Sequence, residues 1–372
     1  MFLPYIQKTQ TLAILALAQV LLLCFVKLSS SALYNNHLEA QNNLDEMIIS
    51  ICGKPSNEID LEECNLLGKI NTPYTSTSGD EYSKRITLKK IFSNVFIHYF
   101  NDLGIGYGDT VAVGMTGSFP GASLAMHSAC NALGIHPIVI SSIGSSAYGA
   151  NTEDLLILDI ENILFNEGKI AKRSTAVSLG GKNDRGGYLI PSADSQRTSD
   201  SSRYNYIAER INELDIELIN HDSLTHSIAH RMDIYNSSVS NSYKAYINIG
   251  GGIASLGVMT DSSISFPSGI ISEPHNITSL DGVINKFLDN NIPAINIQNI
   301  TTIQDEFDIE HGAYIYNTSD NSINEFIRST KLNPFIAICA WFLSVISIIF
   351  IGYQSFKQIK ERMKDIEPES LL

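Results

Sequence analysis

Two long apolar runs stand out in the pattern of hydrophobic and polar positions, one near each end of the chain. The run from Thr11 to Val26 is interrupted only by the polar Gln19, and the run from Pro334 to Tyr353 contains no charged residue. About 20 apolar residues are needed to cross a bilayer as a helix. The pattern therefore predicts a transmembrane anchor over residues 11–32 and a transmembrane helix over residues 333–354.

The first apolar run also has a second interpretation. It is short for a membrane span, and Ser30, Ser31 and Ala32 form a small-residue site of the kind at which signal peptides are cleaved. The run is therefore either an uncleaved anchor, which we favour, or a cleaved signal peptide. The second run is longer and more uniform, so a membrane span is the main interpretation there.

Basic residues indicate which side of the membrane each end of the chain occupies, because lysine and arginine collect on the cytoplasmic side of membrane spans. Four basic residues directly follow the second run: Lys357, Lys360, Arg362 and Lys364. Lys8 precedes the first run. We therefore expect cytoplasmic tails at residues 1–10 and 355–372, and an extracytoplasmic domain between the two spans.

Between the spans, residues 33–80 are polar and are predicted to be irregular, and residues 81–330 form the predicted domain. The stretch 84–104 has apolar residues at helical spacing and predicts an amphipathic helix. The strands are expected at 110–113, 137–142, 175–179, 245–249 and 294–297, and further helices at 118–133, 152–165, 203–213, 223–235 and 279–290. This alternation predicts an α/β domain with a mostly parallel, Rossmann-like sheet and helices on both faces.

Glycine-rich loops follow four of the predicted strands. The members suited to line a ligand site are Gly114, Gly117, Ser118, Gly144, Ser145, Ser146, Gly181, Gly250, Gly251 and Gly252. In an open parallel sheet these loops share the edge at which ligands bind, and glycine lets backbone amides approach an anion. None of them has the spacing of a Walker A or a dinucleotide-binding motif. A tight turn would explain each loop separately, so only their coincidence at one edge favours a ligand site.

The loop GGKNDRGG is the only one of the four that is dense in charge. Its Lys182 and Arg185 are suited to clamp a carboxylate or a phosphate. Its Asn183 and Asp184 are suited to orient a water or a substrate amide. The alternative is a solvated loop without a ligand.

Ser118 and Asp184 are the two candidates for catalysis at this edge. A serine on a strand-to-helix turn can act as a nucleophile, but the string TGSFP lacks the GxSxG pattern of a nucleophile elbow. A helix N-cap explains Ser118 equally well. His226 and His230 have the four-residue spacing of metal ligands, but the glutamate of HExxH is missing. We therefore predict no metal site, and the sequence identifies no cofactor.

Composition narrows the class of partner and the compartment. The chain has 39 acidic and 25 basic residues and a net charge of −14, which disfavours general binding to nucleic acid. Of its five cysteines, Cys52 and Cys64 lie in a polar stretch expected outside the cytoplasm, where a disulfide persists. A disulfide between these two and a pair of free thiols both remain open.

Four strings of the predicted domain, GDTVAVGMTGSFPGAS, PIVISSIGSSAYGAN, SLGGKNDRGG and INIGGGIASLG, together with the apolar run at each end, resemble the poly-gamma-glutamate system protein family. The resemblance covers about residues 80–330. It implies a role in the bacterial cytoplasmic membrane beside the synthase that makes poly-γ-glutamate, a capsule or surface polymer. The implied partners are an amide ligase of the Mur-ligase type, a small multi-span membrane subunit and an extracytoplasmic subunit resembling metallophosphatases. It assigns no catalytic residue.

Three functions follow as hypotheses. The leading one is an accessory factor of poly-γ-glutamate synthesis or export whose glycine-rich edge binds a carboxylate of the polymer. The second is a hydrolase or transferase that acts on γ-glutamyl amides, with Ser118 or Asp184 in the chemistry. The third is a structural scaffold for the synthase complex.

Overall fold

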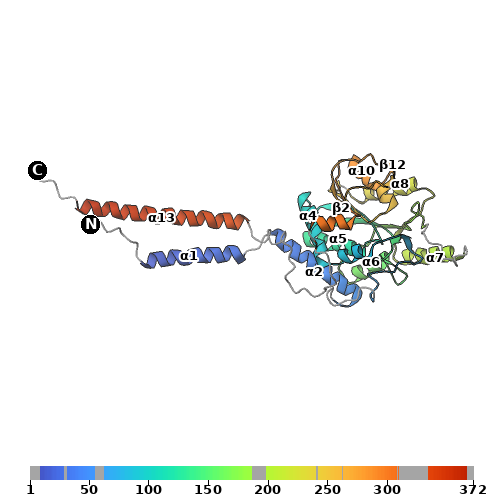
Figure 1. Ribbon diagram of the computed structural model, residues 1–372, viewed down its shortest axis with the longest axis horizontal. Helices are drawn as coiled ribbons and strands as arrows, with labels where there is room; N and C mark the ends of the chain where they lie inside the picture. The colour runs from blue at the N-terminus through green and yellow to red at the C-terminus, as the bar shows by residue number, and fades with distance from the viewer. Residues whose placement is uncertain are drawn as a thin grey trace. The chain divides into compact units, whose positions relative to one another are not determined.

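The computed structural model places most of the chain in two compact units (Figure 1). The residues that it describes are 9–28, 32–54, 63–186, 198–239, 242–261, 263–307, 309 and 334–366. One unit comprises residues 1–35 and 325–372, and the other comprises residues 36–324. The first unit contains the two apolar runs and the second is the α/β domain, so each is described separately.

The first unit contains two helices, α1 (Thr9–Leu28) and α13 (Pro334–Ile366). They lie side by side in opposite directions (Figure 1), and the Ser344 hydroxyl donates a hydrogen bond to the Gln19 side chain. Within the described chain, one helical stretch, Phe335–Glu361, is long and apolar enough to cross a membrane, with a mean hydropathy of 2.6. The apolar stretch of α1, Ala13–Val26, is shorter. One helix of membrane length is thus present, and the other expected span stays a prediction.

The α/β domain is built on a seven-stranded sheet with the strand order β11-β13-β9-β2-β3-β7-β8. The strands are β2 (Thr110–Thr116), β3 (His136–Ser142), β7 (Ala176–Ser178), β8 (Glu217–Ile219), β9 (Tyr246–Ile249), β11 (Gly269–Ile271) and β13 (Ala294–Ile297). Neighbouring strands are parallel except at β11, which runs antiparallel to β13. The predicted α/β class with a largely parallel sheet is confirmed, and each strand expected from the sequence belongs to this sheet.

The order of the strands reverses once. From β2 the chain adds β3, β7 and β8 successively on one side, and then returns to place β9 on the other side of β2 and β13 beyond it. At such a reversal the loops after the two adjacent strands diverge and leave a crevice at the carboxyl ends of the strands. A ligand site is therefore expected between the ends of β2 and β9.

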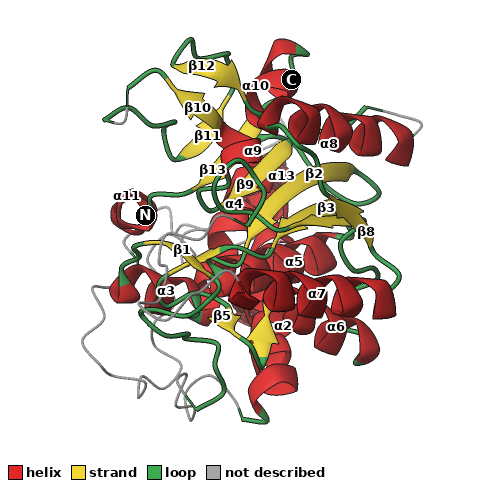
Figure 2. Cartoon of the chain, turned by 90° about the vertical axis from the view of Figure 1, so that its right-hand side faces the viewer, coloured by secondary structure: helices red, strands yellow, loops and turns green. Residues whose placement is uncertain are grey.

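Helices cover both faces of this sheet (Figure 2). On one face lie α8 (Leu224–Ser238) and α10 (Val283–Asp289), and on the other α5 (Pro120–Leu133), α6 (Ile157–Asn166) and α7 (Thr198–Glu213). Successive strand residues point to opposite faces. In β7, Ala176 packs in the cluster that contains residues of α8 and α10, whereas Val177 packs in the cluster that contains residues of α6 and α7. Apolar residues at consecutive positions thus bury the sheet from both sides.

Shorter elements surround this core. They are β1 (Thr75–Thr77), α3 (Glu81–Thr87), the 3-10 helix η1 (Lys90–Phe92), α4 (Ser93–Asp102), β4 (Ser145–Ser146), β5 (Asn151–Thr152), β6 (Leu155–Leu156), α9 (Ile253–Leu256), β10 (Gly257–Met259), β12 (Thr278–Asp281) and α11 (Ile300–Glu306). Strand β1 pairs in parallel with β4 and sets Thr77 opposite Ser146. This pairing attaches the segment before α3 to the loop that follows β3.

The single helix predicted over 84–104 is instead divided into α3, η1 and α4. Asp80 caps α3, because its carboxylate accepts a 2.8 Å hydrogen bond from the amide of Ser83. Lys89 then adopts an extended backbone, with φ −69° and ψ 132°, which ends the helical path. The apolar spacing predicted the buried faces but carried no sign of the break, since a local backbone change leaves the spacing intact.

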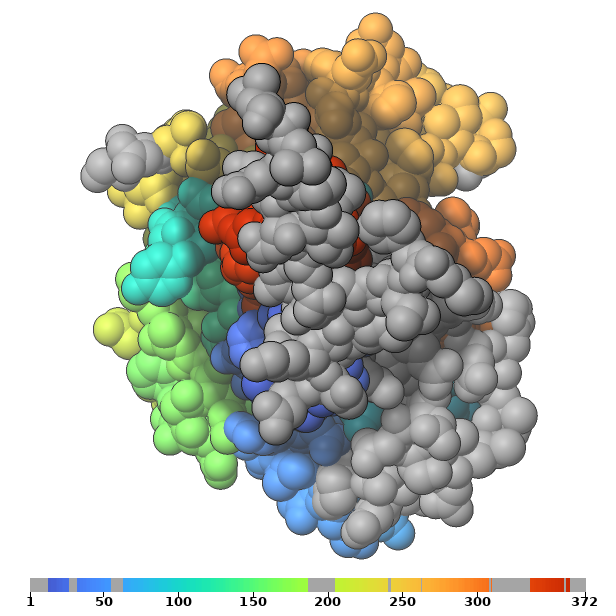
Figure 3. Space-filling view, turned by 90° about the vertical axis from the view of Figure 1, so that its left-hand side faces the viewer, coloured from blue at the N-terminus to red at the C-terminus, as the bar shows by residue number. Residues whose placement is uncertain are grey.

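Residues 33–80 are not irregular throughout, because helix α2 (Ala32–Cys52) occupies the start of this segment. The helix buries a stripe of apolar residues: Ala40, Leu44, Met47 and Ile48. An ion pair of 2.9 Å between Lys169 and Glu46 attaches α2 to the segment after α6. These two segments are neighbours on the surface (Figure 3). The many asparagine and glutamine residues between the buried positions concealed this stripe in the sequence.

A disulfide between Cys52 and Cys64 joins the end of α2 to the segment that follows it. Of the two states that the sequence left open, the structure contains the bonded one. Cys24, Cys130 and Cys339 are free thiols.

Candidate functional site

The four glycine-rich loops lie at the carboxyl-end edge of the sheet, because they follow the parallel strands β2, β3, β7 and β9. Close packing explains several of their glycines. A Cβ on Gly114 would lie 2.1 Å from the Tyr246 hydroxyl. A Cβ on Gly250, whose φ is +94°, would lie 2.3 Å from Thr116 Oγ1. At these two positions the packing of the protein on itself requires glycine, with or without a ligand.

The loops after β2, β3 and β7 also pack on one another. A Cβ on Gly144 would lie 2.9 Å from the nitrogen of Gly181, and one on Gly117 would lie 3.0 Å from a carbonyl oxygen of the loop after β3. Ser145 donates a 2.9 Å hydrogen bond to the carbonyl of Gly117 and so serves the same packing. By contrast, a Cβ on Gly251 would meet nothing closer than 3.9 Å. Free space next to these loops therefore lies at the end of β9.

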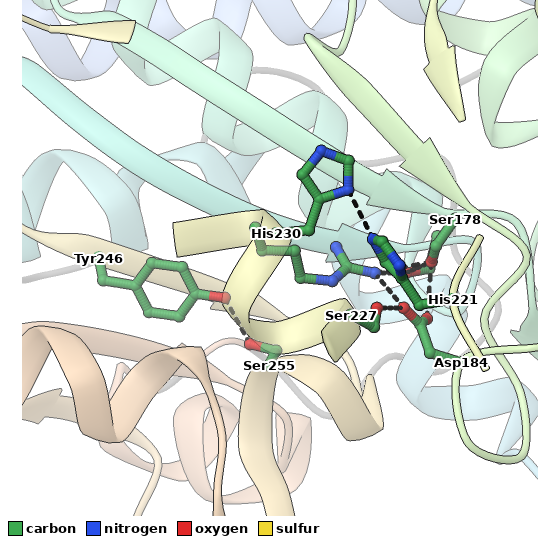
Figure 4. A network of polar contacts seen from close by, with 9 residues as sticks. Ser178, Asp184, His221, Ser227, His230, Tyr246 and Ser255 are labelled. Atoms are coloured by element: carbon green, nitrogen blue, oxygen red, sulfur yellow. Dashed lines mark hydrogen bonds and ion pairs between the residues drawn. The ribbon is translucent and has the colours of Figure 1, made fainter. Parts of the chain in front are cut away.

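Asp184 is turned into the protein and not toward solvent. Asn183 and Asp184 have φ values of 54° and 62°, a left-handed conformation that these residue types tolerate. The Asp184 carboxylate accepts hydrogen bonds from the hydroxyls of Ser178, at 2.6 Å, and of Ser227 (Figure 4). Arg231 Nη2 lies 2.8 Å from its Oδ2. Asp184 is thus engaged in holding a buried arginine, and its expected part in catalysis stays a prediction.

Arg231, on α8, is a buried cation that the sequence did not identify. Besides Asp184, its Nη2 contacts the hydroxyls of Ser178 at 2.7 Å and Ser142 at 3.3 Å. Burial by itself lowers the pKa of the guanidinium, but the adjacent carboxylate of Asp184 raises that pKa above its usual range, so the arginine stays charged. Its Nε is buried and has no hydrogen-bond partner among the described residues. A buried donor on a charged group is costly to leave unpaired, so this N–H is suited to a partner from outside the chain.

Arg231 lines a small cavity of about 10 Å³ at the reversal of the strand order. The other polar and glycine residues that line it are Gly114, Thr116, Ser142, Tyr246, Gly252 and Ser255. The hydroxyls of Tyr246 and Ser255 lie 2.6 Å apart at its β9 side (Figure 4). A cavity of this size holds roughly one water. It therefore accommodates one small polar group beside the arginine, such as a carboxylate oxygen, and not a whole substrate.

The expected cationic clamp, Lys182 and Arg185, lies at the surface of the same edge. Both side chains are exposed, and Arg185 forms a 3.4 Å ion pair with the exposed Asp222. Neither residue lines the cavity beside Arg231. The pair is therefore available to attract an anion, but the buried cation of this edge is a different residue.

His226 and His230 have different surroundings. His230 Nδ1 lies 2.9 Å from His221 Nε2, and His230 Nε2 lies 2.9 Å from Glu217 Oε1. The ring of His226 lies 6.3 Å from that of His221, measured between centroids. In the part of the chain that the structure describes, no three His, Cys, Asp or Glu residues are grouped to hold a metal ion.

Lys84, on α3, is a second buried cation that the sequence did not identify. It is 2% exposed. Its Nζ donates a 2.7 Å hydrogen bond to Ser146 Oγ and another to the carbonyl of Ser118, and lies 3.5 Å from the centroid of the Phe119 ring. Burial lowers the pKa of Lys84 to about 7, against the opposite but smaller effect of Asp80. In the sequence Lys84 begins the basic run KRITLKK, which is typical of an exposed helix face.

Ser118 is not the N-cap of the helix that follows it. Helix α5 begins at Pro120 with Phe119 in the capping position, and Ser118 Oγ accepts a 3.1 Å hydrogen bond from the amide of Ser146. The amide of Ser118 donates to Thr116 Oγ1 at 3.2 Å. Among the described residues no basic side chain contacts the Ser118 hydroxyl. Ser118 thus connects the end of β2 to the loop after β3. The serine hydroxyl that contacts the amine of Lys84 is that of Ser146.

No protein-family model matches this chain, no curated protein is significantly similar to it, and no solved structure matches it. Its function is therefore inferred from the geometry of this edge together with the resemblance of its motifs.

Proposed function

We propose that this protein is a membrane-anchored accessory factor of poly-γ-glutamate synthesis or export, and that its α/β domain binds carboxylate groups of the polymer. The observation that carries the proposal is the charged, buried Arg231, which lines the cavity at the strand-order reversal and whose Nε has no partner within the described ranges. A guanidinium matches a carboxylate in charge and in geometry. The four motifs that resemble the family all contribute loops to this edge, and the resemblance supplies the identity of the polymer.

Exposed and buried cations have separate roles in this proposal. Lys182 and Arg185 attract the polyanion locally, against the net charge of −14 that the whole chain carries. Arg231, held in place by Asp184, receives one carboxylate. Because the cavity measures only about 10 Å³, the tip of one side group enters it and the rest of the polymer lies along the surface of the edge.

The membrane arrangement is part of the proposal. We propose two spans, cytoplasmic tails, a periplasmic domain with a Rossmann-like sheet, and contact with the membrane subunits of the synthase. Helix α13, whose apolar stretch is followed by basic residues, supports an anchor with a cytoplasmic C-terminus. The Cys52–Cys64 disulfide supports an oxidising compartment for the domain. The single reversal of strand order, with helices on both faces, supports the Rossmann-like type of sheet.

The proposal is tested by equilibrium binding of size-defined poly-γ-glutamate to the full chain in detergent. Arg231→Lys keeps the positive charge but removes the fork of N–H donors, so we expect the Kd to rise at least about tenfold, or about 1.4 kcal/mol. Arg173→Lys is the matched control. Its guanidinium contacts Asn162 and the carbonyl of Leu214, next to the amino end of β7, and it should bind the polymer as the wild type does.

Unchanged affinity of a folded Arg231→Lys protein would exclude this cavity as the polymer site. If the wild-type chain itself does not bind the polymer, the scaffold function takes the place of the binding function.

A further inference from the structure

Lys84 and Ser146 form a buried amine–hydroxyl pair that polymer binding does not require. Lys84 Nζ lies 2.7 Å from Ser146 Oγ, although the two residues are 62 positions apart in the chain. The lysine belongs to α3 and the serine to β4, and the parallel pairing of β1 with β4 brings the two segments together. Since β4 closely follows β3, the pair lies at the carboxyl-end edge of the sheet.

The surroundings of Lys84 favour the neutral amine. The ring of Phe119, the residue that precedes α5, contributes to its surroundings, and no carboxylate in the described chain lies within ion-pair distance of Nζ. Glu81 and Arg85 on the same helix form an ion pair of 2.8 Å with each other. The charge of Asp80 raises the pKa of Lys84, but by less than burial lowers it. Burial of an unpaired ammonium is costly, and the resulting pKa of about 7 lets Lys84 accept a proton near neutral pH.

We propose that Ser146 and Lys84 are the nucleophile and the general base of an acyl-transfer reaction on an amide or ester carbonyl. The neutral Nζ takes the hydroxyl proton while Oγ forms a bond to the carbonyl carbon. The tetrahedral intermediate then breaks its bond to the amine or alcohol, which leaves with that proton. Water, deprotonated by the same lysine, attacks the acyl-serine, and its proton returns to Oγ as the carboxylic acid is released.

The position of Ser146 fits a nucleophile. Ser146 and Ser118 are 7% and 9% exposed, and both fractions are larger than the 2% of Lys84. Ser118 also connects the pair to the arginine cavity, because its Oγ accepts from the amide of Ser146 and its own amide donates to Thr116, which lines that cavity. A γ-glutamyl amide, with a carboxylate a few atoms from an amide carbonyl, suits this arrangement. That choice of substrate rests on the proposed function, whereas the nucleophile and base do not.

The experiment uses a fluorophosphonate, which carries no carboxylate and reacts with an activated serine hydroxyl by displacement of fluoride. The full chain in detergent is incubated with the probe over a range of pH, and the adduct is located by peptide mass spectrometry. We expect an adduct on Ser146 whose rate of formation rises as Lys84, with its pKa of about 7, loses its proton. Ser146→Ala should abolish it. Ser76→Ala, which removes a hydroxyl of the neighbouring strand β1 that donates to the Ser145 carbonyl, is the matched control and should label at the wild-type rate.

Lys84→Met and Lys84→Arg test the base. Neither side chain accepts a proton near neutral pH, so labelling should fall about 100-fold or more and lose its rise with pH. Thermal unfolding of each variant identifies a protein that has not folded, and in that case the pH profile of the wild type decides. Because the probe carries no carboxylate, its reaction does not depend on polymer binding, and a failure of polymer binding leaves this result unaffected. Absence of a Ser146 adduct in the wild type at alkaline pH, or full labelling of a folded Lys84→Met protein, would overturn the proposal.

Discussion

The guanidinium of Arg231 and the carboxylate of Asp184 form an ion pair of 2.8 Å in which the side chains are 5% and 3% exposed. The two residues are 47 positions apart, so this one contact ties the loop after β7 to helix α8. It also holds a positive charge near the carboxyl-end edge of the sheet in an acidic protein. The pair therefore links the stability of the domain to the proposed site.

Asp184→Asn should destabilise the α/β domain. The change leaves Arg231 as a buried charge without its counter-ion, which costs about 3–5 kcal/mol. Denaturant unfolding of the full chain measures the loss. The double variant Asp184→Asn/Arg231→Met should recover most of it, because no unpaired charge is then buried. A single variant as stable as the wild type would contradict the ion pair.

Glu161 confers a pH dependence on stability. It is 1% exposed, and its Oε1 accepts a 2.8 Å hydrogen bond from Ser174. Its Oε2 is buried, with no hydrogen-bond partner in the described part of the chain. Burial raises the pKa of Glu161 from 4.5 to about 7. Between these pH values the folded state keeps a proton that the unfolded state releases. Its contribution to the free energy of unfolding is therefore full below pH 4.5 and is lost as the pH rises to about 7.

Glu161→Gln removes this titration. Relative to the wild type, the variant should gain stability as the pH rises from 4.5 to about 7, by on the order of 1–3 kcal/mol. Urea unfolding of both proteins at each pH measures the difference. The comparison cancels the other groups, including His127, whose pKa burial lowers to about 4. A difference that is constant with pH would show that Glu161 ionises in its ordinary range.

Lys182→Ala/Arg185→Ala separates attraction of the polymer from binding in the cavity. Both side chains are exposed, so the free energy of unfolding should change by less than about 0.5 kcal/mol. Polymer affinity should fall at low salt, mainly through slower association, and this loss should disappear at high salt because exposed charges are screened. Binding measured over a range of salt concentrations checks this. A loss that persists at high salt would mean that these cations clamp the polymer directly.

The Cys52–Cys64 bond predicts three free thiols in the native chain. Alkylation of the unfolded, unreduced protein should modify Cys24, Cys130 and Cys339. Because the bond joins residues 12 positions apart, Cys52→Ala/Cys64→Ala should lower the free energy of unfolding by about 2–4 kcal/mol. Modification of all five cysteines would favour the state with two free thiols.

The class of fold could be predicted from the sequence because its signal is local. A short apolar strand such as 110–113, followed by a segment of helical spacing, buries its apolar residues in only a few arrangements, of which the parallel sheet is one. Parallel strands in turn place the loops that follow them at one edge, so the edge itself was predictable. Helix α2 was not predicted, because its apolar stripe is diluted by polar residues.

The side chains that carry the proposed chemistry could not be predicted in this way. Arg231 and Lys84 each lie in a helical segment with polar neighbours, a pattern typical of exposed side chains. The exposed Lys182, by contrast, was predicted to be a cation of the site. Asp184, two positions further on, points inward only because Asn183 and Asp184 adopt positive φ. Neither the backbone conformation nor the direction of the side chain is determined by residue type at these positions.

The sequence by itself determined the helix of membrane length, the alternating strands and helices, and the edge at which the glycine-rich loops gather, since each depends on the order of apolar and polar residues along a short stretch. Only the tertiary structure decided which cations are buried. A basic side chain is buried where distant segments supply its partners, as Asp184 does for Arg231 over 47 positions and Ser146 does for Lys84 over 62. Because those partners meet only after the sheet and its helices have packed, they cannot be predicted from a local sequence pattern.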